Sequence, residues 1–191
     1  MAAALLRLGC NQAALDFIRW YSPYLDSQGF VPCCVDSSGP DWLAEYDSQG
    51  EFVFAVMEYF RFVGDLAFLQ EMWPAVLNAV GFMEDLRNQR LTAEYQQTAC
   101  YGLLPESVSH EGYLAHPVHA YWDDFWALRG LKDAADMAKA LNDQPQATRL
   151  AALRDDFRQT LAASIATTMN ERCIDFLPGS VEWADFDPTA T

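Results

Sequence analysis

The sequence predicts an all-α fold, an α/α toroid of helical hairpins, on the strength of three observations. Apolar residues recur three or four positions apart over long segments, which is the spacing of an amphipathic helix. Three times, a helical segment is followed by a short turn, centred on Gly9, Gly64 or Asn142, and then by a second helical segment. Long irregular segments rich in aromatic and acidic residues separate these pairs. Hairpins whose long loops gather at one end are the layout of a helical solenoid or a closed toroid.

The first hairpin is expected at the start of the chain. Residues 2–8 are helix formers, and residues 12–21 place apolar side chains on one face until Pro23 ends the helix. From residue 24 to residue 49 the pattern changes to turns, with a short strand expected at residues 30–35.

The second hairpin is expected to join a buried helix to a surface helix. Residues 50–63 are apolar around nearly the whole circumference, so this helix should be buried on all sides. Asp65 is placed to cap the next helix, residues 66–90, whose apolar residues form one face. Pro74 fits the first residue of a new helical segment after a kink.

The third hairpin repeats this order in residues 121–141 and 147–169, and Phe125 is expected to point inward. Two adjacent carboxylates, Asp123 and Asp124, open its first helix. Adjacent helical residues point about 100° apart, so only one of the two should face a pocket. We expect Asp123 to cap the helix and Asp124 to bind a sugar hydroxyl.

Composition limits the function classes. The chain has 191 residues, of which 51% are hydrophobic, which suits one domain spanning residues 1–191. A formal net charge of −15 disfavours nucleic acid and anionic membrane surfaces as partners. No apolar run reaches the roughly 18 residues of a membrane span, and none near the N-terminus fits a signal peptide. We therefore expect a soluble protein, with a cytoplasmic location favoured.

The cysteine and histidine patterns argue against a disulfide framework and against a zinc site. The five cysteines are an odd number and include no C-x-x-C pair, and the three histidines lack the H-E-x-x-H arrangement. No metal and no cofactor are expected.

The segment 102–128 holds the densest group of chemically active side chains, with two glutamates, two aspartates, all three histidines, two tyrosines and two tryptophans. Carboxylates accept hydrogen bonds from hydroxyls, and flat rings pack on the C–H faces of a sugar. The segment is therefore expected to line a carbohydrate pocket, to which the acidic and aromatic loop around Trp42 contributes. The expected substrate-binding residues are Trp42, Tyr113, His116, Tyr121, Trp122 and Asp124.

Three segments resemble the six-hairpin, (α/α)6-barrel glycosidases, specifically the bacterial glucoamylase- and trehalase-like proteins. They are DSQGEFVFAVMEYFRFVGDLAFLQEMWPAV, GLLPESVSHEGY and HAYWDDFWALRGLKDAADMA, which together cover most of residues 47–141. The resemblance implies cleavage or binding of O-glycosidic linkages by a pair of carboxylates, mostly with inversion and without a metal. It also implies that three hairpins form about half of a barrel, as a fragment or a shortened relative. The open edge would then favour self-association.

Two glutamates are the expected sources of the catalytic acid. Glu111 lies between His110 and Gly112, where a glycine allows close approach and an aromatic wall could raise the carboxyl pKa. Glu106, which follows Pro105, is the second. In the glycosidase family that the chain resembles, the catalytic base commonly comes from a later hairpin. Whether this chain alone is catalytically active is therefore left open.

Two other function classes remain open. A non-catalytic helical-repeat scaffold for carbohydrate binding or protein interaction would also alternate inner and outer helices, although the unequal spacing of the pairs disfavours a regular repeat. A sugar epimerase-like toroid would use histidines as acid and base, and the three histidines of the loop keep it open.

Overall fold

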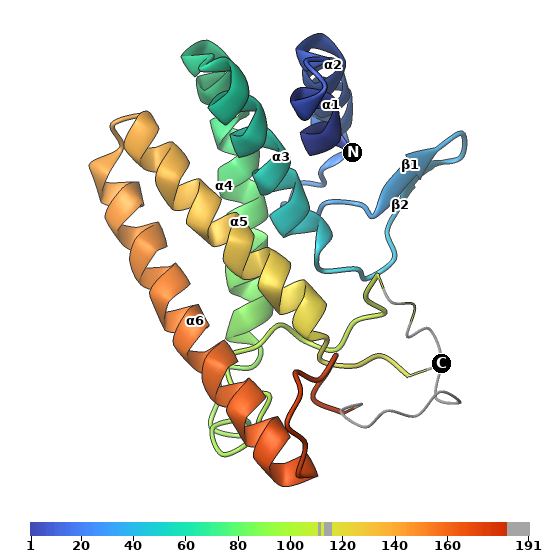
Figure 1. The fold of residues 1–191 in the computed structure, drawn as a ribbon, viewed down its shortest axis with the longest axis vertical. Coiled ribbons are helices and arrows are strands. Elements are labelled where there is room, and N and C mark those ends of the chain that lie inside the picture. Colours follow the sequence, from blue (N-terminus) through green and yellow to red (C-terminus); the bar gives the residue numbers. More distant parts are fainter. Residues whose placement is uncertain (111, 113–115, 183–191) are drawn as a thin grey trace.

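The computed structural model of the chain describes residues 1–110, 112 and 116–182 (Figure 1). Within these residues the fold is mostly helical, as expected, with one small two-stranded antiparallel sheet. None of the described helices is both long enough and apolar enough to cross a membrane.

The helices lie where the apolar periodicity predicts them, with ends that differ by at most three residues. The strand prediction is wrong in position, because the first strand begins at Cys34 and pairs with a second strand that was not expected. The elements in chain order are α1 (Ala2–Arg7), α2 (Asn11–Tyr21), the short 3-10 helix η1 (Ser22–Tyr24), β1 (Cys34–Asp36), β2 (Gly39–Asp41), α3 (Ser48–Val63), α4 (Leu66–Asn88), α5 (Tyr121–Ala140) and α6 (Gln144–Arg172).

The helices pair in the predicted way. The turns between partners place Gly9, Gly64 and Asn142 at positive φ, a conformation that glycine and asparagine adopt at low cost. Helix α3 packs against α4 and α5, while α5 packs against α6, and α1 and α2 lie against α3 (Figure 1). Helices α3 and α5 are thus the central pair.

Two expectations about α4 have different outcomes. Asp65 caps the helix as expected, because its Oδ1 accepts a hydrogen bond from the backbone N–H of Phe68 at 3.0 Å. Pro74 does not begin a new segment, since α4 continues without a break from Leu66 to Asn88.

Burial of the central helices is less complete than the sequence indicates. The core includes Val53 and Val56 of α3, which are fully buried. Phe62 and Val63, in the last turn of α3, are 46% and 40% exposed, so the expectation of burial on all sides is wrong at that end. Phe125 of α5 is 39% exposed and does not point inward. No described helix covers these positions, and the apolar side chains remain at the surface.

Candidate functional site

The N-terminal ends of α3 and α5 lie side by side, at the end of the molecule that also carries the loop before α5 (Figure 1). Two glycines allow this approach. A Cβ on Gly50 would lie 2.0 Å from the carbonyl oxygen of Trp126, and one on Gly130 would lie 2.9 Å from the Cα of Gly50. The two helices therefore touch backbone to backbone, which brings the residues before α3 next to the first turns of α5.

This crossing assembles an aromatic group. The indole N–H of Trp122 donates a hydrogen bond to Oδ2 of Asp47 at 2.8 Å. The Trp122 ring stacks against His110, with centroids 6.2 Å apart, and meets Trp126 edge-on at 6.1 Å. Trp126 in turn lies edge-on to Phe54 of α3 at 5.6 Å. Trp122 is 38% exposed, so one part of this row of rings can meet a ligand.

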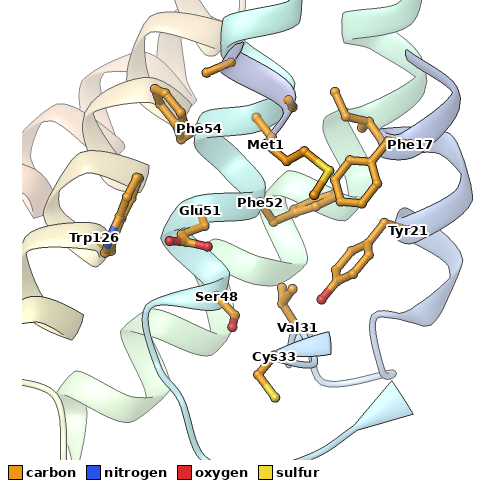
Figure 2. A pocket seen from close by; sticks show the side chains of 14 residues that line it. Met1, Phe17, Tyr21, Val31, Cys33, Ser48, Glu51, Phe52, Phe54 and Trp126 are labelled. Atoms are coloured by element: carbon orange, nitrogen blue, oxygen red, sulfur yellow. The ribbon is translucent and has the colours of Figure 1, made fainter. Parts of the chain in front are cut away.

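A cavity of about 370 Å³ lies between α1, α2, α3 and α5 (Figure 2). Its walls are mostly apolar, and Glu51 is the carboxylate among them. The Glu51 side chain points across the gap between α3 and α5 toward Trp126. Tyr21 and Cys33 line the opposite side. An apolar cavity with a few polar groups is the usual form of a small-molecule site.

Two carboxyl groups near this end have raised pKa values. Burial is the main cause of the raised pKa of Glu51, and the negative charge of Asp47 adds to it, while His110 opposes it. Burial and Asp47 likewise raise the pKa of Glu45. A carboxyl group that keeps its proton closer to neutral pH is suited to general acid catalysis.

The pair Asp123 and Asp124 does not behave as expected, since both side chains are buried. Asp123 does not cap α5. Its carboxylate accepts hydrogen bonds from Ser107 Oγ at 2.5 Å and Ser109 Oγ at 2.9 Å. Burial raises its pKa to about 7, although these two hydrogen bonds oppose the shift. The loop before α5 folds back over the start of the helix. It therefore buries both side chains, although adjacent helical residues point about 100° apart.

Asp124 lies deeper still. Its Oδ1 accepts a hydrogen bond from the backbone N–H of Leu104 at 2.9 Å, while Oδ2 has no hydrogen-bond partner among the described residues. Burial raises the pKa of Asp124 well above its ordinary value. The structure thus places Asp124 inside the protein, away from the cavity lining.

Tyr121 is also internal, at 1% exposure. Its hydroxyl lies 2.9 Å from both Ser164 Oγ and Thr168 Oγ1, which are on α6. Trp42 is 48% exposed and its ring contacts Phe30. Among the predicted substrate-binding residues that the structure describes, Trp122 belongs to the aromatic group beside the cavity.

The remaining predicted residues have varied positions. His116 is exposed at the surface. Glu106 forms an ion pair with Arg90 and lies 3.7 Å from Nε2 of His119. Burial alone would raise the pKa of Glu106, but its own backbone amide, His119 and Arg90 together lower it, which disfavours a role as proton donor. Glu111 and Tyr113 lie outside the described residues.

Sequence reasoning did not identify Glu51 or Trp126 as site residues. Trp126 resembles a core residue by spacing, and its role follows from the contact of α5 with α3. Glu51 carries a weak signal, because it is one of three charged residues, with Glu58 and Arg61, in a helix that is otherwise mostly apolar. Glu51 is an exposed residue, so its place in the cavity wall follows from the fold and not from an unusual burial.

Two groups of described side chains bring three metal-binding atoms within 4.8 Å of one another. One group is Cys33, Cys34 and Asp41, beside the cavity. The other is Cys100, His119 and Glu182.

Comparisons of the chain with protein-family models, with curated protein sequences and with solved structures found no match. The likeness to six-hairpin glycosidases therefore depends on the three sequence segments alone.

Proposed function

We propose that this chain is a glycoside hydrolase-type domain that binds a saccharide at the N-terminal ends of α3 and α5, in an α/α toroid equivalent to about half of a six-hairpin barrel. The observation that carries the proposal is the position of Glu51. This carboxyl group has a raised pKa and lies in the cavity wall, opposite Trp126 and close to the aromatic group of Trp122.

The aromatic side chains supply the binding surface. A sugar presents C–H faces that pack on flat rings, and hydroxyls that donate to carboxylates. The hydrogen bond to Asp47 holds the Trp122 side chain in one orientation. Less side-chain conformational entropy is therefore lost when a sugar ring packs on the indole. The partly exposed ring of Trp122 and the accessible carboxylates of Glu45 and Glu51 offer both kinds of contact at this end of the molecule.

Glu51 is the proposed acid. In glycosidic cleavage one carboxylic acid protonates the leaving oxygen while a second carboxylate activates water or attacks the sugar. Burial favours the protonated form of Glu51, which is the form needed for the first role. Glu111 remains the first candidate that the sequence suggests. The second carboxylate is expected on a further hairpin, as the family resemblance implies, so saccharide binding is the primary activity proposed for this chain.

Saccharide binding tests the proposal. A glycan array identifies a ligand, and calorimetry then compares the wild type with Trp122→Ala, Glu51→Gln and the control Trp20→Ala. Trp20 is 49% exposed on α2 and does not line the cavity, which makes it a matched control. Trp122→Ala should weaken binding about tenfold, the equivalent of one lost ring contact, and Trp20→Ala should leave it unchanged. Glu51→Gln should retain binding.

Two results would overturn the proposal: no binding to any saccharide on the array, or equal weakening by the Trp122 and Trp20 substitutions.

An interaction scaffold is the second candidate function, and a specific observation favours it. Phe62, Val63 and Leu66 form an exposed apolar group at the turn between α3 and α4, at the opposite end of α3 from the cavity.

A further inference from the structure

Three side chains from separate parts of the chain converge beside the start of α5. Cys100 comes from the segment after α4, His119 from the residues just before α5, and Glu182 from the segment after α6. Sγ of Cys100 lies 3.5 Å from Nδ1 of His119, and Oε1 of Glu182 lies 2.6 Å from the same nitrogen. His119 is 3% exposed, whereas Cys100 is half-buried and the side chain of Glu182 is 36% exposed, so solvent reaches the group from one side.

We propose that Cys100, His119 and Glu182 bind a divalent zinc ion through Sγ, Nδ1 and Oε1, with the fourth position open to water. A thiolate, an imidazole and a carboxylate are all ligands that zinc accepts, and three protein ligands with one open position form a tetrahedral site. The inference is independent of the saccharide site, because none of the three residues lines the cavity.

The distances suit a small tetrahedral ion. Zinc bonds of about 2.0 to 2.3 Å place tetrahedral ligand atoms roughly 3.3 to 3.7 Å apart. The separation of Sγ and Nδ1, 3.5 Å, already lies in that range. The contact between Nδ1 and Oε1 is a hydrogen bond of 2.6 Å, and it must open by roughly 1 Å when the ion replaces the shared proton.

The hydrogen-bond pattern argues against a nucleophilic triad of the same three residues. In a triad the histidine uses one ring nitrogen for the nucleophile and the other for the carboxylate. Here Cys100 and Glu182 both meet Nδ1, whereas Nε2 accepts a hydrogen bond from Nε of Arg90 at 3.1 Å. Cys100 and Glu182 therefore lie on the same side of the ring, where a single ion could contact all three residues.

Neighbouring groups already hold the ligands in place. Oε2 of Glu182 accepts a hydrogen bond from the backbone N–H of His119 at 2.9 Å, so Oε1 stays directed at the ring. The backbone N–H of Val181 donates to the carbonyl of His119 at 3.2 Å. Such outer contacts fix ligand orientation in metal sites.

Proton balance is straightforward. The ion displaces the thiol proton of Cys100 to solvent, and the ring proton of His119 moves from Nδ1 to Nε2. Nε of Arg90, which donates to Nε2 at 3.1 Å when no ion is bound, must then turn away from the ring, and Arg90 keeps its ion pair with Glu106. The bound ion would link the segment after α6 to the residues that open α5.

Cobalt titration of the full chain tests the site, because cobalt(II) in a tetrahedral thiolate site absorbs visible light and shows a thiolate-to-cobalt band in the near ultraviolet. The expected result is one cobalt ion per chain, with bands that zinc abolishes by displacement. Cys100→Ala should remove the thiolate band and weaken zinc binding at least about 100-fold. The control Cys173→Ala, an exposed cysteine outside both groups, should change neither.

Two further variants keep the test decisive. Glu182→Gln preserves an oxygen near His119 but removes the charge, and it should weaken binding at least about tenfold while the circular dichroism spectrum stays unchanged. Cys34→Ala disrupts the other group of metal-binding atoms. Absence of a thiolate band in the wild type would overturn the proposal. A band that survives Cys100→Ala and is lost in Cys34→Ala would also overturn it.

Discussion

Trp122 of α5 donates its indole N–H to the carboxylate of Asp47, which precedes α3 by one residue and is 75 positions earlier in the chain. Asp47 is itself 3% exposed. This contact joins the two central helices at the proposed saccharide site, and it fixes the orientation of the ring that would contact the sugar.

Replacing Asp47 by alanine should therefore loosen Trp122. We expect a loss of unfolding free energy of about 1 to 2 kcal/mol, because a hydrogen bond to a charged group is removed while the half-exposed indole can still reach water. The tryptophan emission should also shift to longer wavelength. Urea unfolding measures the first effect and fluorescence the second. The exposed Asp85 of α4 provides a control, and an equal loss in Asp85→Ala would contradict the role of the contact.

Replacing Gly50 by alanine should destabilise the contact between α3 and α5. The added Cβ would lie 2.0 Å from the backbone oxygen of Trp126, which cannot rotate away. We expect a loss of about 3 kcal/mol, the upper part of the range for overpacked sites. Gly81→Ala in α4 is the matched control, because its Cβ would meet nothing within 4 Å. That control should gain about 0.5 to 1 kcal/mol from helix propensity, and thermal unfolding of both variants gives the comparison.

Asp123 should make stability depend on pH. Its pKa is raised to about 7 in the folded protein, against about 3.9 in the unfolded chain. Between these values the folded state binds more protons, so stability is fully present below about pH 4 and is lost as pH rises through 7. The predicted loss is on the order of 4 kcal/mol, since each pKa unit corresponds to 1.36 kcal/mol.

Asp123→Asn should reduce this dependence without abolishing it, because the pKa of Asp124 is also raised and contributes in the same direction. The comparison is the difference in unfolding free energy between pH 5 and pH 8, measured with urea for the wild type, Asp123→Asn and the control Asp85→Asn. The control Asp85→Asn should show the same difference in unfolding free energy between pH 5 and pH 8 as the wild type. An unchanged difference in Asp123→Asn would show that other groups set the pH dependence.

The exposed end of α3 should promote self-association between copies of this chain. Phe62 and Val63 are 46% and 40% exposed in adjacent positions, and grouped apolar side chains favour contact with a second copy. We expect the wild type to show concentration-dependent mass by sedimentation velocity, and the double variant Phe62→Ser, Val63→Ser to move toward the monomer. Phe176→Ser, at an equally exposed phenylalanine outside this group, should have no effect.

The sequence was sufficient to predict the helices because their apolar residues repeat at the helical period, and that period directly encodes which residues share a face. It was sufficient for the capping role of Asp65, which depends on local chemistry. It was insufficient for the strands, because β1 and β2 are three residues each and carry no clear alternation.

The candidate site was harder to predict because its members come from different elements. In an isolated helix only one of the adjacent residues Asp123 and Asp124 could face a pocket, whereas in the folded protein the loop that contains Leu104 and Ser107 covers both. Glu51 becomes a site residue only because α3 crosses α5 at two glycines. Contacts of this kind depend on tertiary packing, and helical periodicity contains no information about them.

The close crossing at Gly50 and Gly130 has a mechanical consequence. Because no side chains separate the backbones there, the two helices lack the soft layer that normally lets neighbours slide past one another. The beginnings of α3 and α5 should therefore move as one rigid body, and any adjustment to a bound molecule should come from the surrounding loops and from side-chain rotation.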